Sequence, residues 1–219
     1  MSDSSRIPFL CDWYQRYLND QDSAAFVRAV SRRYTQGTLQ RLAEHVSSEV
    51  RRGAVLALGF LGDYEANSTV GRALHDTDRT VRILAENGIR NIWFRAGTER
   101  ERQQLTFIVR LISAQQYHEA LSRATDLIHA AEWLAETWNQ RGTAFFRIGR
   151  YTESIRDSHQ ALEINPYHFD AAMSMGQAYL QLDNRVSALE CFRRALRLNP
   201  NLEGVRVQVE RLTRSIEGR

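Results

Sequence analysis

Two nearly identical six-residue stretches stand 34 positions apart: Ala-Leu-Glu-Ile-Asn-Pro at 161–166 and Ala-Leu-Arg-Leu-Asn-Pro at 195–200. The same offset also pairs small and aromatic residues between the two copies: Gly142 with Gly176 and Phe145 with Tyr179. A fixed period of this length is typical of chains built from stacked copies of one small unit. The repeat therefore constrains the fold more tightly than the overall composition does.

The repeated residue types predict pairs of helices. A proline after asparagine, as in Asn165-Pro166, ends one helix and directs the next. We expect Gly142 and Gly176 to let the second helix of each pair approach closely. We expect Ala161 and its partner 34 residues later to do the same for the following pair.

An incomplete copy precedes these two, and one helix follows them. Residues 117–120 match residues 151–154 in sequence type, but Ile108 and Glu132 stand where the later copies have glycine and proline. After residue 202 the apolar residues are spaced by four, three and four: Val205, Val209, Leu212 and Ile216. That spacing makes one apolar stripe on a helix, which we expect to cap the array.

This 34-residue unit resembles the tetratricopeptide repeat, with copies at 101–134, 135–168 and 169–202. The resemblance is strong for 135–202 and partial before it. It implies an interaction module, in which the first helix of each repeat lines a concave face that binds another protein or a peptide. The groove positions carried over from the family are Leu105, Val109, Ile112, Asn139, Thr143, Phe146, Met173, Gln177 and Leu180.

The groove of this chain departs from one pattern of that family. Members that bind chaperone tails clamp a terminal carboxylate with lysine, asparagine and arginine, whereas this chain contains no lysine and only Asn139 is of that type. We therefore expect no carboxylate clamp, and a groove suited to an amphipathic helix or an apolar peptide. The alternative is that the groove buries a segment of this same chain, such as the aromatic stretch around Trp13 and Tyr17.

The first half of the chain has a different period, of 31 residues. Several apolar and basic positions recur at this offset: Val50-Arg51 and Val81-Arg82, Ala54 and Ala85, Leu58 and Ile89, Leu61 and Ile92. The segments resemble HEAT repeats of the short bacterial type found in phycobilisome lyases. The resemblance implies that Arg82 hydrogen-bonds with an aspartate of the preceding corner, Asp76 or Asp78. A ligand-binding row formed by Arg51 and Arg82 is the alternative.

A fainter third copy and a junction complete the predicted organisation. Phe26, Val27 and Val30 continue the 31-residue period, and before them a helix that Pro8 could start carries an aromatic stripe: Leu10, Trp13, Tyr14, Tyr17 and Leu18. Gly97 marks a helix end, and Thr98 with Glu101 spells a capping box. We expect one continuous all-α solenoid, an α-solenoid of antiparallel helix pairs, with a HEAT-like domain at 1–97 and a tetratricopeptide domain at 98–219. Three tryptophans are expected to pack between pairs: Trp93, Trp133 and Trp138.

Candidate chemistry is sparse. The six histidines include no pair four residues apart, and the chain has no Cys-x-x-Cys, so we predict no metal, no cofactor and no catalytic residues. Gly59 and Gly62 do not form a phosphate loop, because a close helix contact or a helix end explains them. Cys11 and Cys191 indicate structural, reduced thiols. The prediction is therefore a protein that is not an enzyme.

The charge and hydropathy patterns bear on partners and location. The net charge is +3, all basic residues in the Lys+Arg count are arginines, and acidic residues are interleaved with them. A nucleic-acid footprint needs a clustered patch, so we expect a protein or peptide partner. The chain shows no membrane-length apolar run and no signal peptide, which favours a cytoplasmic protein. Two alternatives stay open: a HEAT-type enzyme or cofactor-handling protein similar to bilin lyases, and an arginine-mediated nucleic-acid binder.

Overall fold

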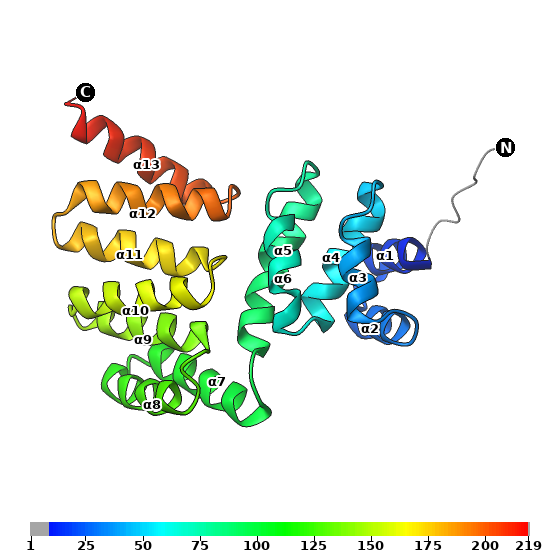
Figure 1. Cartoon of the computed structure of the whole chain (residues 1–219), viewed down its shortest axis with the longest axis horizontal. Coiled ribbons are helices and arrows are strands. Elements are labelled where there is room, and N and C mark those ends of the chain that lie inside the picture. The colour runs from blue at the N-terminus through cyan, green and yellow to red at the C-terminus, as the bar shows by residue number, and fades with distance from the viewer. Residues whose placement is uncertain (1–8, 219) are drawn as a thin grey trace. The chain divides into compact units, whose positions relative to one another are not determined.

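The protein is described by a computed structural model over residues 9–218, and every regular element in that range is a helix (Figure 1). The all-α prediction is confirmed. The chain divides into two compact units, and the boundary lies between Ile92 and Trp93. Pro8, the predicted start of the first helix, lies outside the described residues, and α1 begins at Phe9.

The first unit stacks short helices in sequence order, and its last helix runs on into the second unit. Its elements are α1 (Phe9–Asp20), α2 (Ser23–Ser31), α3 (Gln36–Leu42), α4 (Ser48–Leu61), the 3₁₀ turn η1 (Tyr64–Ala66), α5 (Asn67–Ala73) and α6 (Arg79–Arg95). Helices α4 and α6 meet at glycines: a Cβ built on either Gly59 or Gly88 would lie 2.9 Å from the Cα of the other. The helix-contact explanation of Gly59 is therefore confirmed.

The aromatic stripe of α1 packs inside the first unit. Leu10 and Tyr14 are buried, while Leu18, at the end of the predicted stripe, is 44% exposed. The ring of Trp13 meets Tyr34 edge-on at 6.1 Å between centroids. Tyr17 contacts two further rings, Phe26 at 5.5 Å and Phe60 at 6.0 Å.

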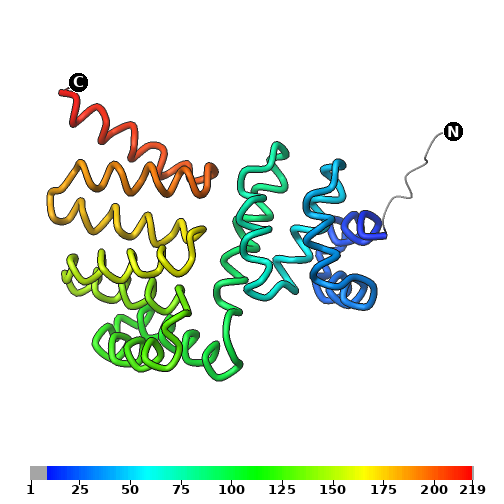
Figure 2. The backbone as a smooth tube through the Cα atoms, in the orientation of Figure 1, coloured from blue at the N-terminus to red at the C-terminus, as the bar shows by residue number. Residues whose placement is uncertain are grey.

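The second unit repeats one helix pair three times and ends in a single helix. Figure 2 shows how its chain runs back and forth from helix to helix. Its helices are α7 (Glu99–Ser113), α8 (Tyr117–Ala130), α9 (Ala135–Arg147), α10 (Tyr151–Ile164), α11 (Phe169–Gln181), α12 (Arg185–Leu198) and α13 (Glu203–Ile216). The first residues of α8, α10 and α12 stand 34 positions apart, as do those of α9 and α11. The predicted helical period is confirmed.

The repeated Asn-Pro pair builds the turn between successive pairs. Asn165 and Asn199 are both fully buried. Each closes its helix by donating its backbone N–H to the alanine carbonyl four residues earlier, at 2.9 and 2.8 Å. Each side-chain Oδ1 then accepts the backbone N–H two residues on, from Tyr167 at 3.1 Å and from Asn201 at 3.0 Å. Because this local bond replaces the helical one, asparagine ends the helix and holds the turn around the proline.

Close approach within each pair depends on the repeated glycine. A Cβ on Gly176 would lie 2.6 Å from the ring of Phe192 on α12, and a Cβ on Gly142 would lie 3.2 Å from the carbonyl oxygen of Ser154 on α10. Both are tighter than ordinary van der Waals contact. The predicted role of these glycines is confirmed.

The link into the second unit is built as the sequence indicates. Gly97 adopts φ +90°, the left-handed conformation that favours glycine. The capping box is complete, with Thr98 and Glu101 each accepting a backbone N–H from the other residue. Trp93 is buried and Trp138 is half-buried, but Trp133 is 47% exposed. The packing prediction for Trp133 is wrong because Leu134, next in the same turn, takes the buried position.

Candidate functional site

The predicted groove positions lie on the first helix of each pair, and α9 packs against both α7 and α11. Two members of the set, Leu105 and Asn139, are buried, with 1% and 6% of their surface exposed. Gln177 is exposed. The remaining six are half-buried: Val109, Ile112, Thr143, Phe146, Met173 and Leu180. The accessible part of this set is therefore mainly apolar.

A buried polar cluster, which the sequence did not predict, lies beneath these positions at the start of α9. The carboxylate of Glu136 is 4% exposed and accepts three side-chain hydrogen bonds. Asn139 Nδ2 and Gln140 Nε2 donate to its Oε1 at 3.1 and 2.6 Å, and His168 Nε2 donates to its Oε2 at 3.0 Å. We call these four residues the Glu136 cluster.

The hydrogen bonds of His168 fix which of its nitrogens donates. Its side chain is fully buried and caps α11, because Nδ1 accepts the backbone N–H of Ala171 at 3.2 Å. The proton of the neutral ring is therefore on Nε2, which faces Glu136. The indole of Trp93 stacks on the imidazole at 4.2 Å between centroids and also contacts Phe169 at 5.2 Å.

The cluster also fixes the orientation of Asn139. A carboxylate can only accept, so the amide turns its NH₂ group towards Glu136. Its Oδ1 is buried and has no hydrogen-bond partner within the described chain. This part of α9 thus holds one carboxylate and one unused acceptor oxygen, and the amide groups of Asn139 and Gln140 each already donate to that carboxylate.

Aligning the 34-residue copies would have indicated this cluster. His168 occupies the place that Leu134 and Leu202 hold in the neighbouring copies, and both leucines are buried. A histidine in an otherwise apolar repeat position must find a buried hydrogen-bond partner. Glu136 is that partner, 32 residues earlier in sequence.

An ion pair between Arg141 and Asp157, with a hydrogen bond to Thr125, joins three helices of the same unit. Arg141 on α9 forms a bidentate pair with Asp157 on α10 at 2.7 and 2.8 Å, and donates to the hydroxyl of Thr125 on α8 at 3.2 Å. Asp157 is 2% exposed, and the Arg141 guanidinium lies 4.9 Å from the centroid of the Trp138 ring. Because the guanidinium of Arg141 bonds to Asp157 and to Thr125, its role is to hold the helices together.

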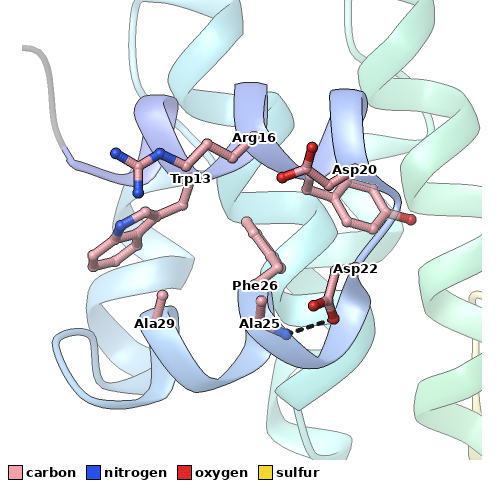
Figure 3. Close-up of a pocket in the computed structure, with 8 residues that line it drawn as sticks. Trp13, Arg16, Asp20, Asp22, Ala25, Phe26 and Ala29 are labelled. Carbon is pink, nitrogen blue, oxygen red and sulfur yellow. Dashed lines mark hydrogen bonds between the residues drawn. The ribbon is translucent and has the colours of Figure 1, made fainter.

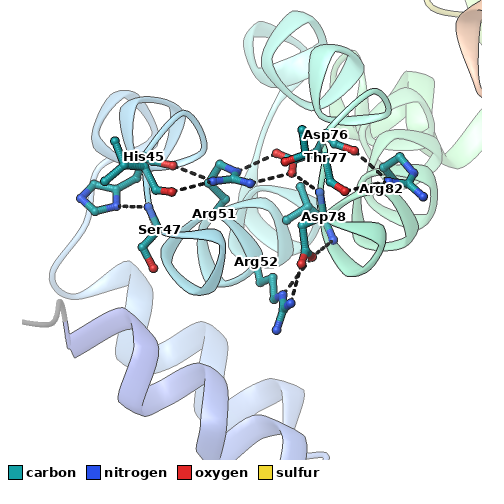
Figure 4. Close-up of polar contacts among 10 residues, drawn as sticks. His45, Ser47, Arg51, Arg52, Asp76, Thr77, Asp78 and Arg82 are labelled. Atoms are coloured by element: carbon teal, nitrogen blue, oxygen red, sulfur yellow. Dashed lines mark hydrogen bonds and ion pairs between the residues drawn. The ribbon is translucent and has the colours of Figure 1, made fainter.

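The arginines of the first unit make a ladder that follows the 31-residue period (Figure 4). Arg82 donates to the carbonyl oxygens of Asp76 and Thr77, at 2.9 and 3.2 Å. Arg51 makes the same two bonds one period earlier, to the carbonyls of residues 45 and 46 at 2.9 and 3.1 Å. The corner itself repeats too: the side chain of Asp76 accepts the N–H of residue 78, and that of His45 accepts the N–H of residue 47.

The expected hydrogen bond between Arg82 and Asp76 is present, but it goes to the backbone carbonyl, and the two carboxylates pair with other arginines. Both oxygens of Asp76 accept from Arg51 at 2.7 Å, and Asp78 pairs with Arg52 at 2.9 and 2.5 Å. The acids of this corner therefore bind arginines of the preceding helix α4, while Arg82 reaches its own corner through backbone carbonyls. The guanidinium groups of Arg51 and Arg52 project from one copy and pair with aspartates of the next. The ladder therefore joins adjacent copies.

The charges of this ladder perturb both acids. The hydrogen bond from Arg52 lowers the pKa of Asp78 to about 2. Burial alone would raise the pKa of Asp76, but the Arg51 hydrogen bond and the backbone N–H of residue 78 outweigh it and lower that pKa.

Other candidate chemistry is limited within residues 9–218. No group of three or more histidine, cysteine, aspartate or glutamate side chains there could hold a metal ion. Burial raises the pKa of the Cys11 thiol to about 11 and also raises that of Cys191. None of the described helices combines the length and hydrophobicity that a membrane span requires.

Comparison with known proteins identifies the repeat type of the second unit. Residues 133–201 match the family model described as tetratricopeptide repeat. A tetratricopeptide repeat-containing protein of Rhizobium etli is 27% identical over 143 residues, which is 65% of this chain and 69% of that protein. Two further relatives are tetratricopeptide repeat protein 37 of Xenopus laevis, 34% identical over 71 residues, and Hsp70-Hsp90 organizing protein 1 of Glycine max, 25% identical over 112 residues. These matches span 32% and 49% of this chain but only 4% and 20% of those proteins.

Solved structures agree on the fold. The first tetratricopeptide domain of Spaghetti (RPAP3), bound to the HSP90 peptide SRMEEVD, has a TM-score of 0.52 and 18% identity over 55% of this chain and 96% of that one. The Arabidopsis OM64 tetratricopeptide domain has a TM-score of 0.51 and 22% identity over 52% of this chain and 95% of that one. Residues 133–201 therefore carry tetratricopeptide repeats, on an all-α fold shared with these domains.

Proposed function

We propose that the second unit is a non-enzymatic protein-interaction module that binds an apolar or amphipathic segment of another protein along α7, α9 and α11. One observation carries the proposal: apolar side chains on these three helices stay partly exposed at the positions where tetratricopeptide repeats bind peptides. Ile112, Phe146 and Leu180 recur at one repeat position, and each is half-buried. A recurring half-buried row of this kind suits the apolar face of a helix.

The Glu136 cluster argues against a carboxylate ligand. Relatives named Hsp70-Hsp90 organizing proteins and the RPAP3 domain with its HSP90 peptide raise the possibility of a tail ending in a carboxylate. In this chain the amide donor of Asn139 is committed to Glu136, and Arg141 is committed to Asp157. A carboxylate laid at the start of α9 would meet a buried negative charge and an acceptor oxygen, so we expect it to be repelled.

The alternative in which this chain fills its own groove is disfavoured by the contacts of α1. The rings proposed for that role, Trp13 and Tyr17, already pack against Tyr34, Phe26 and Phe60 within the first unit. We therefore favour a separate partner protein.

For the first unit we propose HEAT-like repeats, with domain limits at 1–97 and 98–219 and a cytoplasmic scaffold as the whole. Support comes from the 31-residue period of the hydrogen bonds around Arg51 and Arg82. In both copies the arginine is engaged by its own corner, which favours a structural role over a ligand-binding row or a nucleic-acid contact.

The test combines groove variants with partner capture from the native host, identified by mass spectrometry. Phe146→Asp with Met173→Asp should abolish capture while the far-ultraviolet circular dichroism stays helical. Gln177→Arg tests the same face at an exposed position, so its effect cannot come from a lost core contact. Phe107→Asp is the matched control, because Phe107 is an exposed aromatic on α7 outside the groove positions.

The outcomes separate the possibilities. Partner capture that survives both groove variants would refute the groove as the binding site. The first unit would then be the next candidate for the binding surface. Unfolding of the double variant would identify Phe146 and Met173 as core, leaving Gln177→Arg to decide the question. Titration with the peptide SRMEEVD should give no saturable signal, and submicromolar binding of that peptide would overturn the argument from the Glu136 cluster.

A further inference from the structure

A pocket of about 260 Å³ opens between α1 and α2 in the first unit, and none of its lining residues is a groove position. Three aromatic rings contribute to its wall: Trp13, Tyr17 and Phe26. Two small residues one turn apart on α2, Ala25 and Ala29, leave space beside them (Figure 3). The aromatic rings on one side and the two alanines on the other leave space for a long, unbranched side chain.

One end of the pocket is acidic. Asp20 is the last residue of α1 and Asp22 caps the start of α2, and both line the pocket. Asp22 uses one oxygen to accept the N–H of Ala25 at 2.9 Å. The side-chain carboxylate of Asp20 accepts no hydrogen bond and forms no ion pair within the described residues.

The one basic residue of the lining does not neutralise these acids. Arg16 is four residues before Asp20, a spacing that allows an ion pair on a helix. No such pair forms, and in Figure 3 the Arg16 guanidinium lies beside Trp13, at the end of the pocket away from both aspartates. The pocket is thus divided into an acidic end and an aromatic, basic end.

We propose that this pocket binds the arginine side chain of a basic segment in a partner protein. A guanidinium is planar, so it forms forked hydrogen bonds to carboxylates and stacks on aromatic rings. Its place is the acidic end, between Asp20 and Asp22. Its aliphatic stem then lies along Phe26 and Ala25. Arg16 repels a cation from the opposite end and so sets the direction in which the side chain enters.

The experiment uses the full chain and a defined probe, N-acetyl-arginine methylamide, titrated while ¹⁵N-resolved spectra report the indole and backbone N–H groups of α1 and α2. The matched uncharged probe is N-acetyl-norleucine methylamide, and the anionic probe is N-acetyl-glutamate methylamide. We expect saturable shifts at Trp13 and around Asp22 with the arginine probe, weakened by added salt. The other two probes should leave these signals unchanged.

Two variants assign the effect to the acids. Asp20→Asn should weaken the arginine probe by about threefold, as for one partly exposed ion pair, and adding Asp22→Ser, which retains a helix cap, by about tenfold. Asp12→Asn is the control, since Asp12 is an exposed acid of the same helix outside the pocket. Equal binding of the norleucine probe, preference for the glutamate probe, or an undiminished affinity of the double variant would each overturn the proposal.

Discussion

Replacing Gly88 by alanine tests how closely α4 and α6 pack. The new Cβ would lie 2.9 Å from the Cα of Gly59, whereas carbon atoms prefer about 3.5–4.0 Å. The obstacle is a backbone atom, so no rotamer change relieves it, and the helices must separate by roughly 0.6–1 Å. Such overpacking costs about 1–3 kcal/mol, and the better helix propensity of alanine returns about 1 kcal/mol. We therefore expect the first unit to lose up to about 2 kcal/mol of unfolding free energy.

Urea unfolding followed by circular dichroism measures this loss. Gly37→Ala is the control, because Gly37 lies in α3 with nothing within 4 Å of its Cβ position. That variant should be as stable as the parent or slightly more stable. Gly59→Ala should match Gly88→Ala, and the double variant should lose less than the sum, since helices already separated by one methyl group accommodate the second. A stabilised Gly88→Ala variant, or strict additivity of the pair, would refute this account of the crossing.

Three further outcomes follow from the polar contacts. Arg82→Ala should lower the free energy of unfolding by about 1–3 kcal/mol and leave partner binding intact; unchanged melting with lost binding would instead place Arg82 in a ligand site. The folded-state pKa of Asp78 is about 2 against an ordinary value of 3.8, so its pair with Arg52 stabilises the fold above about pH 4 and that contribution disappears towards pH 2. Stability measured against pH should show the difference between the parent and Asp78→Asn shrinking over this window, and a constant difference would contradict it. Glu136→Gln should cost about 1–3 kcal/mol in thermal or urea unfolding, because the new NH₂ group faces donors such as His168; a neutral effect would mean that these bonds are not formed.

The sequence predicted the second unit well because its architecture depends on residues that recur. Gly176 must be small for Phe192 to pack, and Asn199 must end its helix. Both requirements return every 34 residues, so a simple offset reveals them. The predicted groove positions follow from the same register, but their exposure does not: Leu105 is buried, whereas Met173, at the same repeat position, is half-buried.

Features that occur once, or that link one copy to the next, were not predicted from the sequence. The period marks His168 as a polar residue at a position that holds Leu134 and Leu202 in the neighbouring copies. It does not identify Glu136 as the hydrogen-bond partner, because the bond joins two copies at unlike repeat positions. The HEAT resemblance implied Asp76 or Asp78 as the partner of Arg82, but both carboxylates pair with arginines of the preceding helix α4. Pairing between copies depends on how far a side chain projects, which spacing along the chain does not encode.

The position of Asp76 has a consequence for how the first unit unfolds. Its carboxylate belongs to one copy but is neutralised by Arg51 of the copy before, so melting either copy leaves a half-buried charge alone in the other. Adjacent copies linked in this way favour cooperative opening over independent fraying. Amide hydrogens in α4 and α6 should then exchange at a common rate set by one shared opening event, and that event should become more frequent in acid, as the aspartates of the corner take up protons.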